Sequence, residues 1–82
     1  MNMSLDAILK IVREFVERKR GKSVQTIGAS TALLRDGYLD SFALVELIAD
    51  LEKHLNTRLE DGALIPEDFE TPETLYNRLQ EL

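Results

Sequence analysis

One serine hydroxyl is placed where it could be modified chemically. Ser41 follows Asp40 at the point where a stretch rich in turn residues gives way to apolar residues at helical spacing. Because the first N–H groups of a helix lack partners within it and its dipole is positive there, a phosphate attached to this hydroxyl would be stabilised. The simpler interpretation is that Asp40 and Ser41 only cap the helix, since both residue types are favoured caps worth about 1 kcal/mol.

The other reactive residues offer weaker sites. A calcium loop beginning at Asp36 would need a carboxylate at position 47, which is Leu47. Ser41 and His54 are too far apart to act as a hydrolytic pair. They lie at opposite ends of one predicted helix, about 20 Å apart at 1.5 Å per residue. We therefore expect no catalytic residue and no metal site. We interpret the acidic cluster in the C-terminal half as a solvated surface, and the alternative is a binding site for a cation or a basic partner. The cluster comprises Glu60, Asp61, Glu67, Asp68 and Glu70.

Four segments are predicted to be helical, and none has the period of a strand. Apolar residues recur at helical spacing over residues 4–20 and 41–55, a short turn is expected at 66–69, and the last helix begins at Pro72. Residues 21–40 combine turn residues with scattered apolar anchors, which predicts a long loop pinned to the core. The expected fold is all-α, a bundle of three main helices and one short helix, in a single domain over residues 1–82.

The helix over residues 41–55 carries more apolar surface than one helix face normally buries. Its main stripe comprises Leu44, Leu47, Ile48, Leu51 and Leu55. Phe42, Val45 and Ala49 form a second apolar row, displaced around the helix. We expect Phe42 and Val45 to form an apolar docking surface beside Ser41.

Charge and composition narrow the class of protein. The chain has 82 residues, a net charge of -5 and no cysteine, so its core is thin and disulfides are excluded. Because the chain is acidic, it should repel nucleic acid and could attract basic surfaces on protein partners. The simpler explanation of the charge is that it keeps a small protein soluble. No apolar run approaches the roughly 20 residues that span a bilayer, and the first residues lack a signal-peptide pattern. We expect a cytoplasmic protein.

The residues around Ser41 resemble a known attachment signature. Asp-Gly-Tyr-Leu-Asp-Ser-Phe at residues 36–42, followed by Val-Glu-Leu at 45–47, is similar to the motif of acyl carrier proteins. That family typically has Asp-Ser-Leu followed by a segment like Val-Glu-Leu. The predicted helices also follow the family's order, so the resemblance covers nearly the whole chain.

The resemblance implies a carrier, not an enzyme. A phosphopantetheinyl transferase would move 4'-phosphopantetheine from coenzyme A to Ser41, and the arm's thiol would hold an acyl or aminoacyl group as a thioester. Asp40 matches the acidic residue of the motif. Further expected partners are a loading ligase or acyltransferase and downstream synthases. The carrier itself is expected to be a monomer. The implied partner face comprises Phe42, Val45, Glu46, Ala49, Asp50 and Glu52.

Departures from the fatty-acid type leave the cargo open. Phe42 replaces the usual Leu, Leu44 stands where a polar residue is common, and Lys53 replaces a frequent acid. Leu39 also differs from the Gly common in carriers of peptide synthetases. The pattern is closer to free-standing carriers acting in trans, including aminoacyl and D-alanyl types, while a fatty-acid or polyketide pathway stays open.

Two alternatives of other classes remain. One is a helical adaptor that keeps the carrier fold but is never modified. The other is a helix-turn-helix protein, which is disfavoured because the second helix offers only Lys53 and His54 as basic residues. Tyr38 either shields the base of an arm or packs the loop.

Overall fold

The fold is all-helical, as the sequence predicts. The computed structural model describes residues 3–21 and 26–82, in which the helices are α1 (Leu5–Arg20), α2 (Ser41–Leu55), the 3-10 helix η1 (Pro66–Phe69) and α3 (Pro72–Glu81). No strand occurs in these residues. Helix α1 contacts both α2 and α3, and η1 contacts α2 and α3. None of the helices in the described part of the chain has the length and apolar character needed to cross a membrane.

The helix boundaries follow from capping residues. The Ser4 side chain accepts a hydrogen bond of 3.1 Å from a first-turn N–H of α1, and Thr71 does the same for α3 at 3.0 Å. Helix α1 ends at Gly21, whose φ of 72° lies in the left-handed region that glycine adopts without steric cost. These caps are local in sequence, and the predicted boundaries of α1 and of the start of α3 are therefore confirmed.

The core is formed by the apolar stripes of the helices and by anchors from the loops. In α2 the stripe residues Leu44, Leu47 and Leu51 are buried, while Ile48 and Leu55 are partly buried against them. The buried apolar residues of the whole core are Ile8, Ile11, Val12, Phe15, Val16, Ile27, Leu33, Leu39, Leu44, Leu47, Leu51, Leu64, Phe69, Leu75 and Leu79. The helical spacing in the sequence therefore identifies the faces that are buried.

The connection between α1 and α2 is held against the rest of the bundle. Of the residues described there, 26–40, Ile27, Leu33 and Leu39 are buried in the core. The Leu33 N–H donates to the Glu70 carbonyl at 2.9 Å, and the Glu73 N–H donates to the carbonyl of residue 29 at 3.0 Å. The loop that precedes α2 is thus fixed to the junction between η1 and α3, as the predicted apolar anchors require.

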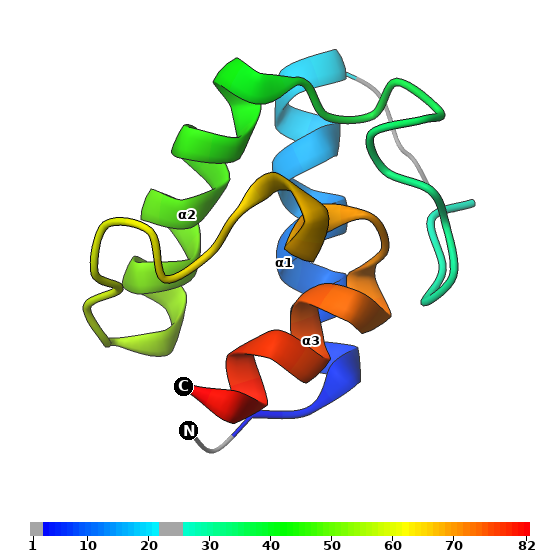
Figure 1. The fold of residues 1–82 in the computed structure, drawn as a ribbon. Coiled ribbons are helices and arrows are strands. Elements are labelled where there is room, and N and C mark those ends of the chain that lie inside the picture. The colour runs from blue at the N-terminus through cyan, green and yellow to red at the C-terminus, as the bar shows by residue number, and fades with distance from the viewer. Residues whose placement is uncertain (1–2, 22–25) are drawn as a thin grey trace.

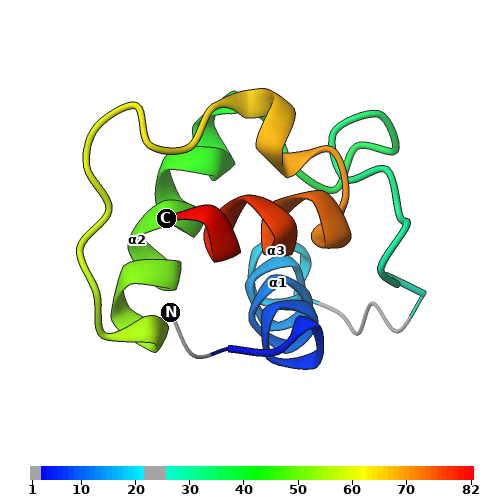
Figure 2. The ribbon, with the colours of Figure 1, turned by 60° about the horizontal axis from the view of Figure 1, so that its bottom comes forward.

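The two ends of the bundle differ. Figure 1 shows that α1 ends and α2 begins at the top of the molecule, because the two helices run in opposite directions. At the bottom, α1 begins and α3 ends, and Figure 2 brings this end forward. The top of the bundle is where Ser41 lies, since it is the first residue of α2.

Candidate functional site

Asp40 and Ser41, the two candidate caps of α2, have different roles in the structure. Asp40 is the N-cap, with extended backbone angles of φ -124° and ψ 177°, and its Oδ1 accepts a hydrogen bond of 2.8 Å from the Ala43 N–H. Ser41 is the first helical residue and is exposed. Among the residues that the structure describes, none hydrogen-bonds to the Ser41 hydroxyl. The cap interpretation is therefore correct for Asp40, and it leaves the serine hydroxyl free.

The electrostatics at this helix end suit an anion. Helix α2 has no acidic residue in its first turn. The Asp40 side chain satisfies one of the first N–H groups, while those of Ser41 and Phe42 have no partner within residues 3–21 and 26–82. A phosphate ester on Ser41 would lie beside these donors and the positive end of the dipole. The residues present thus fit a phosphate-linked group.

The loop before Ser41 is fastened to the end of α1. Arg20 donates a hydrogen bond of 2.8 Å to the Gly37 carbonyl, and its guanidinium lies 4.6 Å from the centre of the Tyr38 ring. The Tyr38 hydroxyl is 3.3 Å from Oγ1 of Thr26. These contacts favour the packing role that was one of two expectations for Tyr38. They also hold Asp40, two residues later, in position to cap α2.

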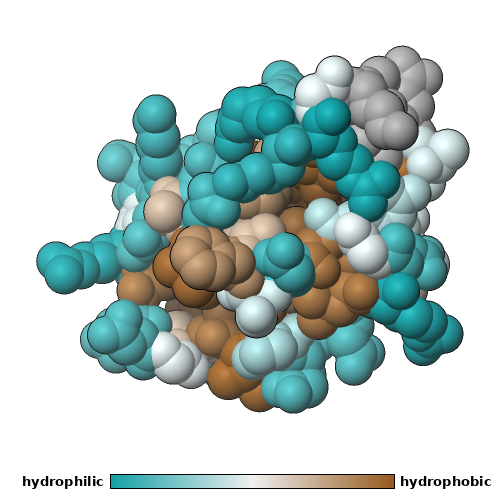
Figure 3. All heavy atoms as spheres, turned by 90° about the horizontal axis from the view of Figure 1, so that it is seen from above, coloured by the Kyte–Doolittle hydropathy of each residue, from teal (hydrophilic) through white to brown (hydrophobic). Residues whose placement is uncertain are grey.

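The second apolar row of α2 is exposed. The Phe42 residue is 82% exposed and Val45 is 69% exposed, and Ala49 is exposed one turn further on. Large apolar side chains are rarely left in water without a reason when they are adjacent. Figure 3, which views the bundle from above, shows apolar atoms gathered on this end and surrounded by hydrophilic ones. The row has the exposure that a docking surface requires.

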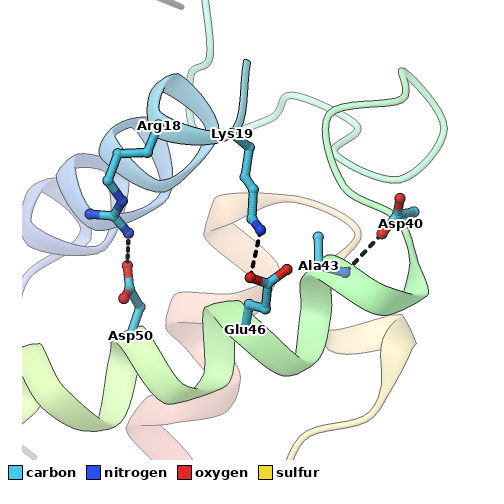
Figure 4. Close-up of polar contacts among 6 residues, drawn as sticks. All are labelled: Arg18, Lys19, Asp40, Ala43, Glu46 and Asp50. Atoms are coloured by element: carbon cyan, nitrogen blue, oxygen red, sulfur yellow. Dashed lines mark hydrogen bonds and ion pairs between the residues drawn. The ribbon is translucent and has the colours of Figure 1, made fainter. Parts of the chain in front are cut away.

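The acidic residues around this row do not project freely into water. Glu46 accepts a hydrogen bond of 2.5 Å from Lys19, and Asp50 forms an ion pair with Arg18, as Figure 4 shows. Both cations belong to the last turn of α1. These pairs were missed in the sequence, where the basic run at 18–20 was explained by the helix dipole alone, because they join residues about thirty positions apart.

The third acid of the expected partner face is also engaged. Glu52 accepts a hydrogen bond of 2.7 Å from the Leu59 N–H, in the segment that follows α2. That segment, residues 57–61, and the side of α2 that bears Val45, Ile48 and Glu52 line an open groove. Ser41 lies on this same side of α2, since it is separated from those residues by four, seven and eleven positions.

The acidic cluster of the C-terminal half has the character of a solvated surface. Glu60, Asp61, Glu67 and Glu70 are exposed. The remaining member, Asp68, accepts a hydrogen bond of 2.9 Å from the Ile65 N–H and lies 3.7 Å from Nε of Arg78. In the described residues, no three His, Cys, Asp or Glu side chains gather as a metal site would require.

The described chain is thus a small helical bundle with an exposed serine at the first residue of its second long helix. Comparison with known proteins identifies the family. The family described as "phosphopantetheine attachment site" matches residues 6–79, so the chain belongs to it. A solution NMR structure of a holo acyl carrier protein from Nitrosomonas europaea is similar, with 30% identity and a TM-score of 0.71, covering 94% of this chain and 92% of that chain. No curated protein sequence matches the chain.

Family membership determines the class of function. The protein is an acyl-carrier-type protein whose cofactor is covalently bound 4'-phosphopantetheine, and it is a carrier and not a catalyst. Proteins of this class act together with a phosphopantetheinyl transferase and with synthase enzymes.

Proposed function

We propose that Ser41 carries the arm, and that the chain, as one carrier domain over residues 1–82, holds an acyl or aminoacyl group as a thioester for a biosynthetic pathway. The observation that carries this proposal is the free, exposed Ser41 hydroxyl at the first residue of α2, beside a cap that Asp40 alone supplies. A serine that served only as a cap would stand at the N-cap position, which Asp40 occupies.

Each neighbouring residue has a part in the proposed attachment. Transfer from coenzyme A forms a bond between Ser41 Oγ and phosphorus, while the hydroxyl loses its proton and the nucleotide part of coenzyme A leaves. The bound group supplies a terminal thiol that forms the thioester. The start of α2 stabilises the phosphate. Asp40 fixes where the helix begins, and Arg20 holds the preceding loop at Gly37.

We further propose that the carrier acts in trans in the cytoplasm, as a monomer loaded by an adenylating ligase or an acyltransferase. The Leu-Asp-Ser-Phe sequence at residues 39–42 supports an aminoacyl or D-alanyl cargo. The internal pairing of Glu46 and Asp50 agrees with this departure from the fatty-acid type, because it leaves α2 with less free acidic surface. A fatty-acyl or polyketide cargo is the alternative.

The attachment is tested by incubating the protein with coenzyme A and a promiscuous phosphopantetheinyl transferase. Intact-mass measurement should show the gain of one phosphopantetheine, and Ser41→Ala should abolish the gain. Ser30→Ala is the matched control, since Ser30 is exposed but lies in the loop, and this variant should gain the full mass. No gain would favour the unmodified adaptor, and a gain that survives Ser41→Ala would mean that the arm is attached to another residue.

The cargo is tested on the modified protein. With ATP and an adenylating ligase, an aminoacyl carrier should gain the mass of one aminoacyl group, that is, one amino acid less one water, and hydroxylamine should remove it because a thioester is labile to this nucleophile. Loading by acyltransferases with acyl-coenzyme A, and not by any amino-acid ligase, would contradict the aminoacyl assignment.

A further inference from the structure

We propose that Glu52 is a positioning residue for arm transfer, because its carboxylate holds residues 57–61 in place as a second wall of the surface that partner enzymes contact. This inference rests on the proposed function, in which partners reach Ser41 across the docking face, the exposed side of α2 that bears Phe42 and Val45. The family resemblance implies a different role for Glu52, which is direct contact with a partner.

The chain that follows α2 is bonded to Glu52 in two ways. The Glu52 backbone carbonyl accepts the Thr57 N–H at 3.1 Å, a bond that any residue at position 52 could make. The Glu52 Oε2 atom accepts the Leu59 N–H at 2.7 Å, which requires a side chain that ends in an acceptor and is long enough to reach back. Within residues 3–21 and 26–82, no other side chain of α2 hydrogen-bonds to residues 57–61.

The place of Glu52 in the helix supports a structural task for its carboxylate. Helix α2 ends at Leu55, so Glu52 lies in the last turn, where the negative end of the helix dipole disfavours an anion. Its neighbours Lys53 and His54 are of the basic types that suit this position. A hydrogen bond to a charged acceptor is stronger than one to a neutral acceptor. The bond to Leu59 therefore offsets the unfavourable position of the charge.

The segment that Glu52 holds faces the same open groove as the helix surface beside Ser41. Residues 57–61 line one side of this groove, and Val45 and Ala49 are among the residues that line the other. Both of these α2 residues belong to the exposed apolar row, so the groove and the docking face are continuous. Ser41 lies one helical turn before Val45 on the same side of α2. A partner that reaches Ser41 across this side therefore also meets residues 57–61.

Loss of the carboxylate should weaken docking without changing the chemistry at the serine. The Leu59 side chain is partly buried against the core, but its N–H would lose its acceptor, and residues 57–61 would be displaced in a fraction of the molecules. Only the remaining fraction presents both walls, so the apparent affinity for a partner falls in proportion. The position of Ser41 is set by the Asp40 cap, which Glu52 does not contact.

Three variants test the proposal with a promiscuous phosphopantetheinyl transferase and coenzyme A as the probe. Glu52→Ala removes the acceptor and the charge, whereas Glu52→Gln removes only the charge. Ser4→Ala is the matched control, because it also deletes a side-chain acceptor of a backbone N–H, at the opposite end of the bundle. Intact-mass kinetics give kcat and KM for the carrier, hydrogen exchange follows the Leu59 amide, and circular dichroism checks that each variant is folded.

The expected result is a change in KM that depends on the hydrogen bond and not on the charge. Glu52→Ala should raise KM about fivefold, leave kcat within about twofold, and speed exchange of the Leu59 amide. Glu52→Gln should restore most of the loss, and Ser4→Ala should have the KM of the wild type.

Four outcomes overturn the inference. An equal rise in KM in Glu52→Gln would mean that the partner contacts the charge directly. An equal rise in Ser4→Ala would mean that general stability explains the effect. Unchanged KM in Glu52→Ala would exclude residues 57–61 from docking, and unchanged Leu59 exchange would show that the bond does not hold them. Failure of the proposed function is distinct, since the wild type would then gain no mass, or Ser41→Ala would still gain it.

Discussion

Two neighbouring residues of similar capping ability perform different tasks at the start of α2. Asp40 accepts the first-turn N–H of Ala43, while the hydroxyl of Ser41 faces solvent with no bond to any described residue. If the roles were exchanged, the hydroxyl would be engaged by the backbone and less available to a transferase. Aspartate at position 40 therefore makes position 41 chemically accessible.

Removing the Asp40 cap should weaken the fold. Asp40→Ala should lower the free energy of unfolding by about 1 kcal/mol, because the Ala43 N–H loses its acceptor. Asp40→Asn should lose less, since asparagine also caps and only the interaction of the charge with the helix dipole, about 0.3–1 kcal/mol, disappears. Urea denaturation measures both. Equal losses in the two variants would show that charge, and not the hydrogen bond, is what Asp40 contributes.

At the level of the helix, one face of α2 packs in the core and stabilises the fold, while another face is exposed and forms the proposed docking surface. Leu44, Leu47 and Leu51 point into the core, and Phe42 and Val45 point into water. The two sets are interleaved along the sequence and diverge only because the helix turns by about 100° at each residue. Substitutions on the two faces should therefore have different consequences.

Phe42→Ala should change the free energy of unfolding by less than about 0.5 kcal/mol, because the side chain is 82% exposed. The same substitution should slow arm transfer, since it removes the apolar centre of the proposed docking face. Leu47→Ala, on the buried face, should cost about 2–5 kcal/mol. Chemical denaturation and intact-mass kinetics measure the two quantities. A loss of stability in Phe42→Ala comparable to that of Leu47→Ala would contradict the assignment of the faces.

Helix positions could be predicted from the sequence because caps and apolar spacing are local signals. Ser4, Gly21, Asp40 and Thr71 mark the boundaries without reference to any other part of the chain. The ion pairs from α1 to Glu46 and Asp50 could not be predicted in this way. They depend on how two helices pack, and the basic run at residues 18–20 has a sufficient local explanation in the helix dipole.

At the level of the whole molecule, the free energy of unfolding is small, so a single substitution in the core can remove a large part of it. For 82 residues, a free energy of unfolding of roughly 4–12 kcal/mol is typical. The exposed ion pairs add only about 0.2–1 kcal/mol each, so burial dominates. Phe69 is 1% exposed and belongs to η1, which contacts both α2 and α3. A short helix thus contributes one of the largest buried side chains.

Phe69→Ala should cost about 3–5 kcal/mol, a large part of the total, because it leaves a cavity where η1 meets the other helices. Ile65→Ala is the control in the same segment, and it should cost much less since Ile65 is 49% exposed. The midpoint of urea denaturation followed by circular dichroism reports both. A small effect at Phe69 would mean that the core closes around the missing ring.

The start of α1 and the end of α3 lie at the opposite end of the bundle from Ser41, and this has a practical consequence. Helix α1 begins and α3 ends at the bottom of the bundle, while α2 begins at the top (Figure 1). An affinity tag, a fluorescent protein or a sensor surface joined to either end would be held away from the serine. The carrier can therefore be immobilised in one orientation, with its reactive end directed toward enzymes in the flowing solution.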